Sequence, residues 1–172
     1  ETERLIGICD HNCADIAGLS SILAAMISIA SDPLGCEEFV FDLERLALYW
    51  RGFLRRRGIV NEELQITGGE LLRRAAKEKY PRAVLVYAQD IMRNGDYERG
   101  RKLLIKASES DYPLNIKIAA LRSLAIDSER NQKNIAASVE FVKRAIELMP
   151  QDVRKDEFER RKERLEKKRK LV

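Results

Sequence analysis

Apolar residues along this chain recur mostly at spacings of three and four positions, which is the period of an amphipathic helix. The pattern is clearest in residues 37–57, where the apolar positions are Phe39, Leu43, Leu46, Ala47, Trp50, Phe53 and Leu54. No stretch alternates apolar and polar residues over a length that would suit a β-strand. The pattern therefore predicts an all-α fold.

Capping and breaking residues divide this pattern into helices. Asn12, with an acid three residues on at Asp15, is expected to cap a first helix that runs to about Ala30, and Gly58 to end a second. Thr67-Gly68-Gly69 is expected to interrupt any long helix after residue 61. The predicted helices are about residues 13–30, 37–57, 70–79, 82–94, 97–110, 114–127 and 134–149, the last two joined by a polar link at 128–133.

One short pattern occurs three times between Gly68 and Pro150. Each copy has a small residue, two spacers, two apolar residues, a basic residue one position further on and then an alanine, and a proline follows. The copies run from Gly68 to Ala75, from Gly100 to Ala107 and from Ser138 to Ala145. The first two copies are offset by 32 residues, including the pairs Tyr80-Pro81 and Tyr112-Pro113. A period of this size is typical of stacked helical hairpins.

The middle copy lies in a segment, residues 81–114, that resembles a tetratricopeptide repeat (TPR). The residues that carry the resemblance are Val84, Tyr87, Ala88 and Ile91, the turn Gly95-Asp96-Tyr97-Glu98, and Gly100, Leu104 and Ala107. The third hairpin ends at Leu148-Met149-Pro150, close to the ending usual in the family, but has Ser138 where a small apolar residue is usual. The resemblance covers about residues 37–150.

The resemblance implies a right-handed superhelix of stacked antiparallel helix pairs, a TPR-like α-solenoid. Its three units would be residues 37–80, 81–113 and 114–150. Residues 1–36 are expected to form an N-terminal helical segment. Residues 151–172 are expected to form a basic C-terminal capping helix, with a narrow apolar stripe at Val153, Phe158 and Leu165.

The N-terminal segment contains an apolar stretch, residues 14–30, whose residues are apolar or small apart from Asp15 and three serines. A helix that spans a membrane needs about 20 apolar residues, so this stretch is at the lower limit of length. A helix buried against its neighbours explains the stretch equally well, and we expect no stable membrane span. Packing in the array, in an interface or near a membrane remain open alternatives for these residues.

The formal net charge of +4 is not spread evenly along the chain. Residues 1–150 contain 22 basic and 22 acidic residues, whereas residues 151–172 contain ten basic and six acidic residues. Candidate anion-binding residues are therefore Lys167, Lys168, Arg169 and Lys170 in the tail, together with the run Arg55, Arg56 and Arg57. They support an alternative function in nucleic-acid binding, although the neutral sum over residues 1–150 argues against an extended nucleic-acid track.

The residue types that catalysis requires do not form a recognisable constellation. The single histidine, His11, lies between Cys9 and Cys13 at a spacing that is not a usual zinc pattern, and on a helix it points away from the face that the two thiols share. The glycines do not form a phosphate-binding loop. We therefore expect no enzymatic activity, no cofactor and no metal site. Three cysteines, the third being Cys36, favour reduced thiols and a cytoplasmic location.

The resemblance also implies where a partner would bind. In the family the first helix of each pair lines a concave face, and the corresponding residues are Arg82, Leu85, Gln89, Met92, Arg93, Lys117, Leu121 and Leu124. This mixture of cations and apolar side chains suits an extended or helical peptide that carries acidic groups. The resemblance therefore implies a non-catalytic protein–protein interaction module that acts as an adaptor, scaffold or assembly factor.

Overall fold

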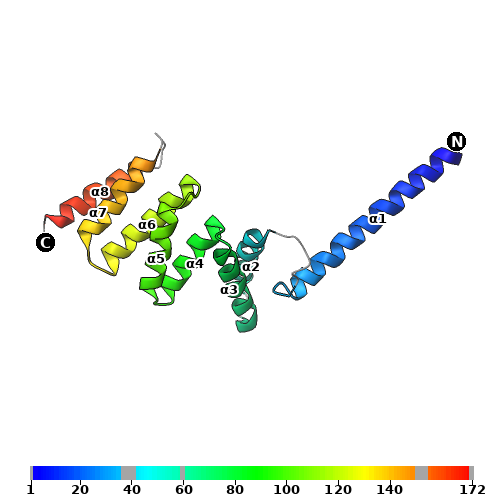
Figure 1. Cartoon of the computed structure of the whole chain (residues 1–172), viewed down its shortest axis with the longest axis horizontal. Coiled ribbons are helices and arrows are strands. Elements are labelled where there is room, and N and C mark those ends of the chain that lie inside the picture. The colour runs from blue at the N-terminus through cyan, green and yellow to red at the C-terminus, as the bar shows by residue number, and fades with distance from the viewer. Residues whose placement is uncertain (1, 36–41, 59–60, 150–154, 171–172) are drawn as a thin grey trace. The chain divides into compact units, whose positions relative to one another are not determined.

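A computed structural model describes residues 2–35, 42–58, 61–149 and 155–170 of the chain. These residues form eight helices and no strand (Figure 1). The prediction of an all-α protein is therefore confirmed. The chain divides into two compact units, Glu1–Leu71 and Leu72–Val172, and the boundary between them falls inside one helix.

The first unit contains α1 (Thr2–Ser31), α2 (Leu43–Arg57) and the larger part of α3 (Glu62–Lys77). α1 starts well before the predicted cap at Asn12, which lies inside the helix. The prediction of this start was wrong because residues 2–12 contain no proline, and the one glycine among them, Gly7, costs a helix only about 1 kcal/mol. α2 begins after Asp42, whose Oδ1 accepts a hydrogen bond from the amide of Arg45 at 3.0 Å, and residues 37–41 of the predicted helix lie outside the described residues.

α3 continues through Thr67-Gly68-Gly69, so the predicted interruption is wrong. Asn61 caps this helix by accepting a hydrogen bond from the amide of Leu64 at 3.0 Å. The indole of Trp50 on α2 covers Gly68 and donates from Nε1 to the carbonyl oxygen of Leu64 at 3.3 Å. Gly68 therefore makes room for an aromatic ring inside a regular helix and does not end it.

The neighbouring glycines Gly68 and Gly69 provide a matched test of this contact. A Cβ at residue 68 would lie 2.9 Å from Cδ1 of Trp50, whereas a Cβ at residue 69 would have no neighbour within 4 Å. We expect Gly69→Ala to raise the free energy of unfolding by about 0.5–1 kcal/mol through helix propensity. We expect Gly68→Ala to lower it, because displacement of the indole outweighs that gain. Chemical denaturation followed by Trp50 fluorescence measures both changes, and equal gains at the two positions would contradict the contact.

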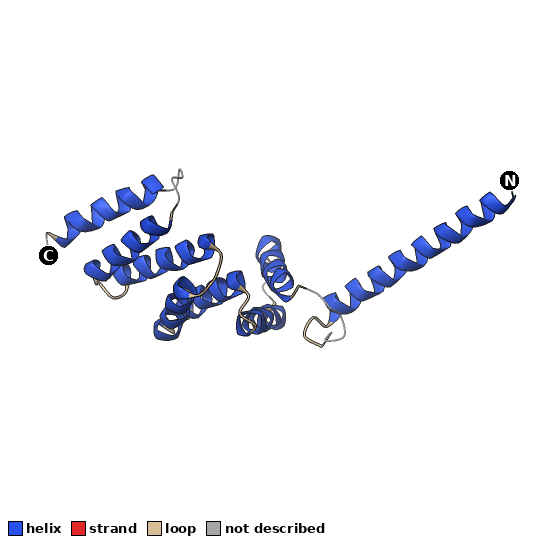
Figure 2. Cartoon of the chain, turned by 45° about the horizontal axis from the view of Figure 1, so that its top comes forward, coloured by secondary structure: helices blue, strands red, loops and turns tan. Residues whose placement is uncertain are grey.

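The second unit contains the end of α3 followed by α4 (Pro81–Arg93), α5 (Tyr97–Glu109), α6 (Leu114–Arg130), α7 (Ile135–Leu148) and α8 (Lys155–Arg169). Each helix from α4 to α8 packs against the next one, and α4 also contacts α6 (Figure 2). One hydrophobic cluster joins α4, α5 and α6. A second cluster joins α6, α7 and α8, and it contains Phe158 and Leu165, the two buried residues of α8. Val153, the third residue of the predicted stripe, lies outside the described residues.

Local features of the sequence account for the starts of α4, α5 and α7. α4 begins at Pro81, whose fixed φ angle suits the first turn of a helix. The side chains of Asp96 and Asn134 accept hydrogen bonds from the amides of Arg99 and Ala137, at 3.1 and 3.0 Å, and so begin α5 and α7. Gly95 makes the turn between α4 and α5 with a φ of +97°, a conformation that favours glycine.

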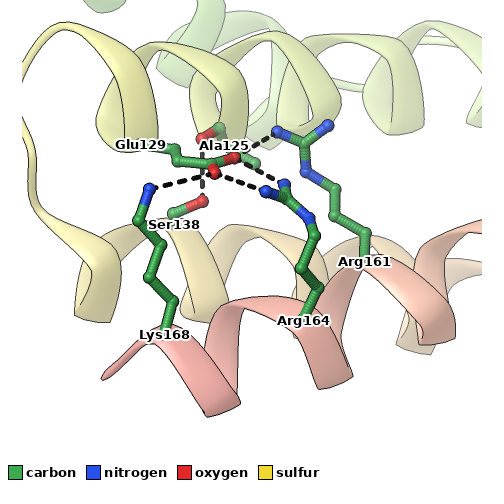
Figure 3. Close-up of polar contacts among 6 residues, drawn as sticks. All are labelled: Ala125, Glu129, Ser138, Arg161, Arg164 and Lys168. Atoms are coloured by element: carbon green, nitrogen blue, oxygen red, sulfur yellow. Dashed lines mark hydrogen bonds and ion pairs between the residues drawn. The ribbon is translucent and has the colours of Figure 1, made fainter. Parts of the chain in front are cut away.

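The threefold sequence pattern marks positions of equal burial in three helices. The small residues Gly68, Gly100 and Ser138 are all buried, and so are the residues four and seven positions further on in each copy: Leu72, Leu104 and Val142, and Ala75, Ala107 and Ala145. A Cβ at Gly100 would collide with Met92 and lie 2.8 Å from the carbonyl oxygen of Ala88 on α4. In the third copy the hydroxyl of Ser138 donates a hydrogen bond to the corresponding carbonyl, that of Ala125 on α6, at 2.8 Å (Figure 3). The pattern thus identifies where each of these second helices approaches the helix before it.

α6 is longer than predicted and ends at Arg130. Asp127, Ser128 and Glu129 are therefore helical and buried, although residues 128–133 were predicted to form a polar link. Asp127 is covered because Arg101 of α5 lies over it, with Nε 2.8 Å from Oδ2 of the carboxylate. The extra turn of α6 is thus stabilised by partners that are distant in the sequence.

Candidate functional site

α4 and α6 lie side by side and are joined by a polar contact. Nε2 of Gln89 on α4 donates a hydrogen bond to Oγ of Ser123 on α6 at 3.0 Å, and that hydroxyl donates to the carbonyl oxygen of Ala119 at 3.0 Å. Gln89 belongs to the predicted partner-binding set. This contact links the first helices of two successive hairpins, which is the side of the unit where that set was expected.

Four of the eight predicted partner-binding residues are core residues. Leu85, Met92 and Leu124 belong to the cluster between α4, α5 and α6, and Leu121 belongs to the cluster between α6, α7 and α8. Leu121 and Leu124 are each only 1% exposed. The expectation that these four side chains line an open face is corrected, because neighbouring helices cover them. The apolar part of the predicted surface is thus used for packing.

The other four residues of the set remain accessible at least in part. Arg82 and Arg93 are exposed, and Gln89 and Lys117 are half-buried. Arg93 has an ion pair with Asp90 one turn earlier, at 3.4 Å. The accessible members of the set are therefore three cations and one amide, which makes this surface polar and basic.

A second polar cluster holds α8 against α6 and was not predicted. The carboxylate of Glu129, whose side chain is 7% exposed, accepts two hydrogen bonds of 2.8 Å from the two terminal nitrogens of Arg164 (Figure 3). Arg161 donates to the same carboxylate at 2.9 Å, and Nζ of Lys168 lies 3.6 Å away. One buried carboxylate from α6 thus meets three cations on successive turns of α8.

The electrostatics of this cluster follow from burial and charge. The hydrogen bonds from Arg164 are the largest influence that holds the pKa of the Glu129 carboxyl below its usual range. Burial opposes this effect, and the charges of Arg164, Arg161 and Lys168 reinforce it. Burial lowers the pKa of the Arg161 guanidinium, against the charge of Glu129. The cluster therefore favours the ionised form of Glu129.

The predicted anion-binding residues of the tail divide into two groups. Lys168 takes part in the Glu129 cluster, so part of the basic face of α8 is used to dock this helix. Lys167, Arg169 and Lys170 are exposed. Arg169 also lines a shallow hollow with Lys133, next to the start of α7. The tail thus contributes both to packing and to the charge of the surface.

The arginine run of α2 lies in the other unit. Arg56 and Arg57 are exposed at the end of α2, and the side chain of Arg55 lies outside the described residues.

On α1, Cys9 and Cys13 are exposed free thiols, and Nε2 of His11 lies 3.5 Å from Oδ2 of Asp15. Within residues 2–35, 42–58, 61–149 and 155–170, no group of three or more His, Cys, Asp or Glu side chains is arranged to hold a metal ion. Cys36 is not among the described residues.

One sequence signal would have pointed to the Glu129 cluster. Arg161, Arg164 and Lys168 recur at spacings of three and four, so they share one face of α8. This face lies beside the apolar stripe that buries Phe158 and Leu165, which brings it next to the preceding hairpin. The identity of its acidic partner depends on how far α6 extends, and the sequence pattern ended that helix too early.

Comparison of the chain with protein-family models, with curated proteins and with solved structures finds no match. A function for this chain is therefore inferred from its own residues and contacts.

Proposed function

We propose that α4 to α7 form a non-catalytic, TPR-like module that binds a peptide or a partner protein carrying acidic groups. The binding surface is the side on which α4 and α6 lie next to each other. The observation that carries the proposal is the contact between Gln89 and Ser123, which joins these alternate helices, together with the cations Arg82, Arg93 and Lys117 on the same two helices. In this role the chain acts as an adaptor, scaffold or assembly factor in the cytoplasm.

The equal burial of the three copies supports the TPR-like part of the proposal. Small residues at Gly68, Gly100 and Ser138 allow each second helix to approach the helix before it, as stacked hairpins require. The contact between α4 and α6 supports a stack in which first helices share one side. A right-handed superhelix is the arrangement that we propose for these pairs.

The residues that remain accessible determine the kind of partner. Because Leu85, Met92, Leu121 and Leu124 are core residues, recognition depends mainly on Arg82, Gln89, Arg93 and Lys117. Exposed cations steer and orient an acidic ligand more than they add to its affinity, and salt screens them over about 10 Å. The proposed binding is therefore selective for acidic sequences and weakens as salt increases.

The test uses peptides selected by display against the full chain, with affinities measured by fluorescence anisotropy. We expect the triple variant Arg82→Glu, Arg93→Glu and Lys117→Glu to weaken binding by at least about tenfold, since each exposed charge pair contributes about 0.2–1 kcal/mol and reversal adds repulsion. The matched control is Lys102→Glu, Lys106→Glu and Lys143→Glu, which reverses three exposed lysines on α5 and α7. Equal losses in the two triple variants, or no loss in the first, would show that the surface is misplaced.

A second binding experiment, with nucleic acid as the ligand, separates the proposal from the alternative. The alternative predicts binding to labelled RNA or duplex DNA that falls steeply with salt and is lost after substitution of Lys167, Arg169 and Lys170 by alanine. These three residues are preferable to Lys168, because Lys168 also contacts Glu129. Binding of this kind, with the acidic peptides unaffected by the triple reversal on α4 and α6, would favour the alternative.

A further inference from the structure

α1 exposes an unusually large apolar surface. Eight of its large apolar side chains are 55–66% exposed: Ile6, Ile8, Ile16, Leu19, Ile22, Leu23, Met26 and Ile27. None of the apolar window of this helix is buried. Proteins in water rarely leave so many neighbouring apolar side chains uncovered. The expectation of no stable membrane span assumed that neighbouring helices would bury this helix, and its exposed side chains remove that basis.

The uncharged part of α1 is a few ångströms shorter than the hydrocarbon layer of a bilayer. Residues Ile6–Ser31 are long enough and apolar enough to cross a membrane, by length and composition. Asp15 and Asp32 bracket the uncharged stretch from Ile16 to Ser31. At about 1.5 Å per residue this stretch is about 24 Å long, against about 27–30 Å for the hydrocarbon layer. Local thinning of the bilayer by a few ångströms, which costs little, lets the two carboxylates reach opposite headgroup regions.

Two of the four serines within this stretch have hydroxyls that do not require water. The hydroxyls of Ser20 and Ser21 donate hydrogen bonds to the carbonyl oxygens of Ile16 and Ala17, at 2.8 and 2.9 Å. Such bonds to the preceding turn satisfy a hydroxyl donor inside the helix itself. In a bilayer every polar group needs a partner of this kind, because the hydrocarbon layer offers none.

The distribution of residues around α1 favours lipid over a groove on another protein. A helix that binds such a groove is apolar on one side and charged or strongly polar on the other. In α1 the large aliphatic residues between Ile16 and Ser31 share one side, and the other side carries Ala, Ser and Gly. Between Ile16 and Ser31 neither face of the helix carries a charged residue. Both sides are therefore compatible with a hydrocarbon environment.

We propose that α1 spans a lipid bilayer and anchors the chain to a membrane, with Asp15 near one headgroup region and Asp32 near the other. The test expresses the full chain in cells and follows it through membrane fractionation and flotation with phosphatidylcholine–phosphatidylglycerol vesicles. We expect the chain to remain with the membranes in high salt and in alkaline carbonate, which release peripheral proteins. Release by either treatment would overturn the proposal, and so would an intact mass that lacks α1, which would identify a cleaved signal segment.

A charge in the middle of α1 tests the insertion directly. We expect Leu23→Arg to reduce the ratio of membrane-bound to soluble chain by about 100-fold, the effect of about 2.5–3.5 kcal/mol for an arginine at the centre of a span. The matched control is Ile66→Arg on α3, a side chain that is also exposed, at 64%, and we expect it to leave this ratio unchanged. Equal losses in both variants would overturn the proposal. A soluble wild-type oligomer that Leu23→Arg dissociates would assign α1 to self-association and overturn it as well.

Labelling of thiols distinguishes a span from a helix that lies on the surface. One chain keeps Cys9 as its only thiol, and a second carries Asp32→Cys as its only thiol. In sealed membrane vesicles of uniform orientation, we expect a membrane-impermeant maleimide to label one chain and not the other until detergent is added. Labelling of both chains without detergent would place both ends on one side and overturn the span.

Discussion

Glu129→Gln is expected to lower the free energy of unfolding of the second unit by about 2–3 kcal/mol. Removal of one partner from a buried ion pair costs about 3–5 kcal/mol, because the other charge is left without compensation. Here the cost is smaller, since Arg164 is 55% exposed and turns toward water, while Arg161 is 21% exposed and less able to do so. The remaining Arg161, Arg164 and Lys168 repel one another on the same face of α8. The expected result is a loosened α8 on an otherwise intact unit.

Hydrogen–deuterium exchange of the full chain measures this loosening locally. We expect faster exchange in α8 and in the last turn of α6, with little change in α4 and α5. Trp50 lies on α2, so its fluorescence does not report this change. The matched control is Glu157→Gln, which removes an exposed bridge from α8 to Arg122 of α6, 2.8 Å long. An exposed bridge contributes about 0–1 kcal/mol, so we expect almost no change; comparable effects of the two variants would argue against a special role for Glu129.

The stability difference between wild type and Glu129→Gln is expected to depend on pH, with a defined sign. The pKa of Glu129 is lower in the folded protein than its usual value of 4.5. A carboxyl of this kind stabilises the fold fully above the unfolded pKa, and its contribution is lost as the pH falls through the lower folded pKa. The difference between wild type and Glu129→Gln is therefore expected to be largest near neutral pH and to shrink in acid below about pH 4. Denaturation midpoints for the two chains across this range measure it, and a difference that grows in acid would contradict the assigned cause.

Gly100→Ala is expected to lower the free energy of unfolding by about 1–3 kcal/mol, although alanine favours a helix by about 1 kcal/mol over glycine. The added methyl group would collide with Met92, a flexible side chain, and would lie 2.8 Å from the carbonyl oxygen of Ala88, which is backbone. Met92 has room to move only at the expense of its cluster between α4, α5 and α6. α4 and α5 must therefore separate.

Chemical denaturation followed by far-ultraviolet circular dichroism measures this loss, and hydrogen exchange locates it in α4 and α5. The control is Gly69→Ala, where the same change on a helix meets no neighbour within 4 Å and is expected to stabilise. The double variant Met92→Ala with Gly100→Ala tests the source of the cost. The comparison is with Met92→Ala alone. If Gly100→Ala cost no stability once Met92 was replaced by alanine, the backbone contact with Ala88 would not be the limiting one.

Local features of the sequence determined the helical class and most helix ends of the described residues. The turn at Gly95 and the caps at Asp96 and Asn134 act within a few residues of where they stand, so sequence proximity suffices to predict them. The small residues Gly100 and Ala107, which the threefold pattern repeats, are buried in α5, because only a small residue at such a position lets two adjacent helices approach. The same local reasoning was wrong at Gly68 and Gly69, where it treated glycine as a break. In the folded unit the indole of Trp50 fills the space beside the first of them.

Tertiary structure alone decided what several of the helix faces meet. Leu121 and Leu124 fit a ligand-facing position in one hairpin, but burial depends on the next helices along the chain, and α5 to α8 cover them. Glu129 belonged to a predicted polar link and became the buried centre of an ion cluster, because its three partners arrive from a helix about 35 residues further on. The exposure of α1 could not be predicted from its sequence either. A core helix and a membrane helix have similar apolar compositions, and only the surroundings of the helix distinguish them. Periodicity specifies how a segment folds, whereas contacts between distant segments specify what its faces meet.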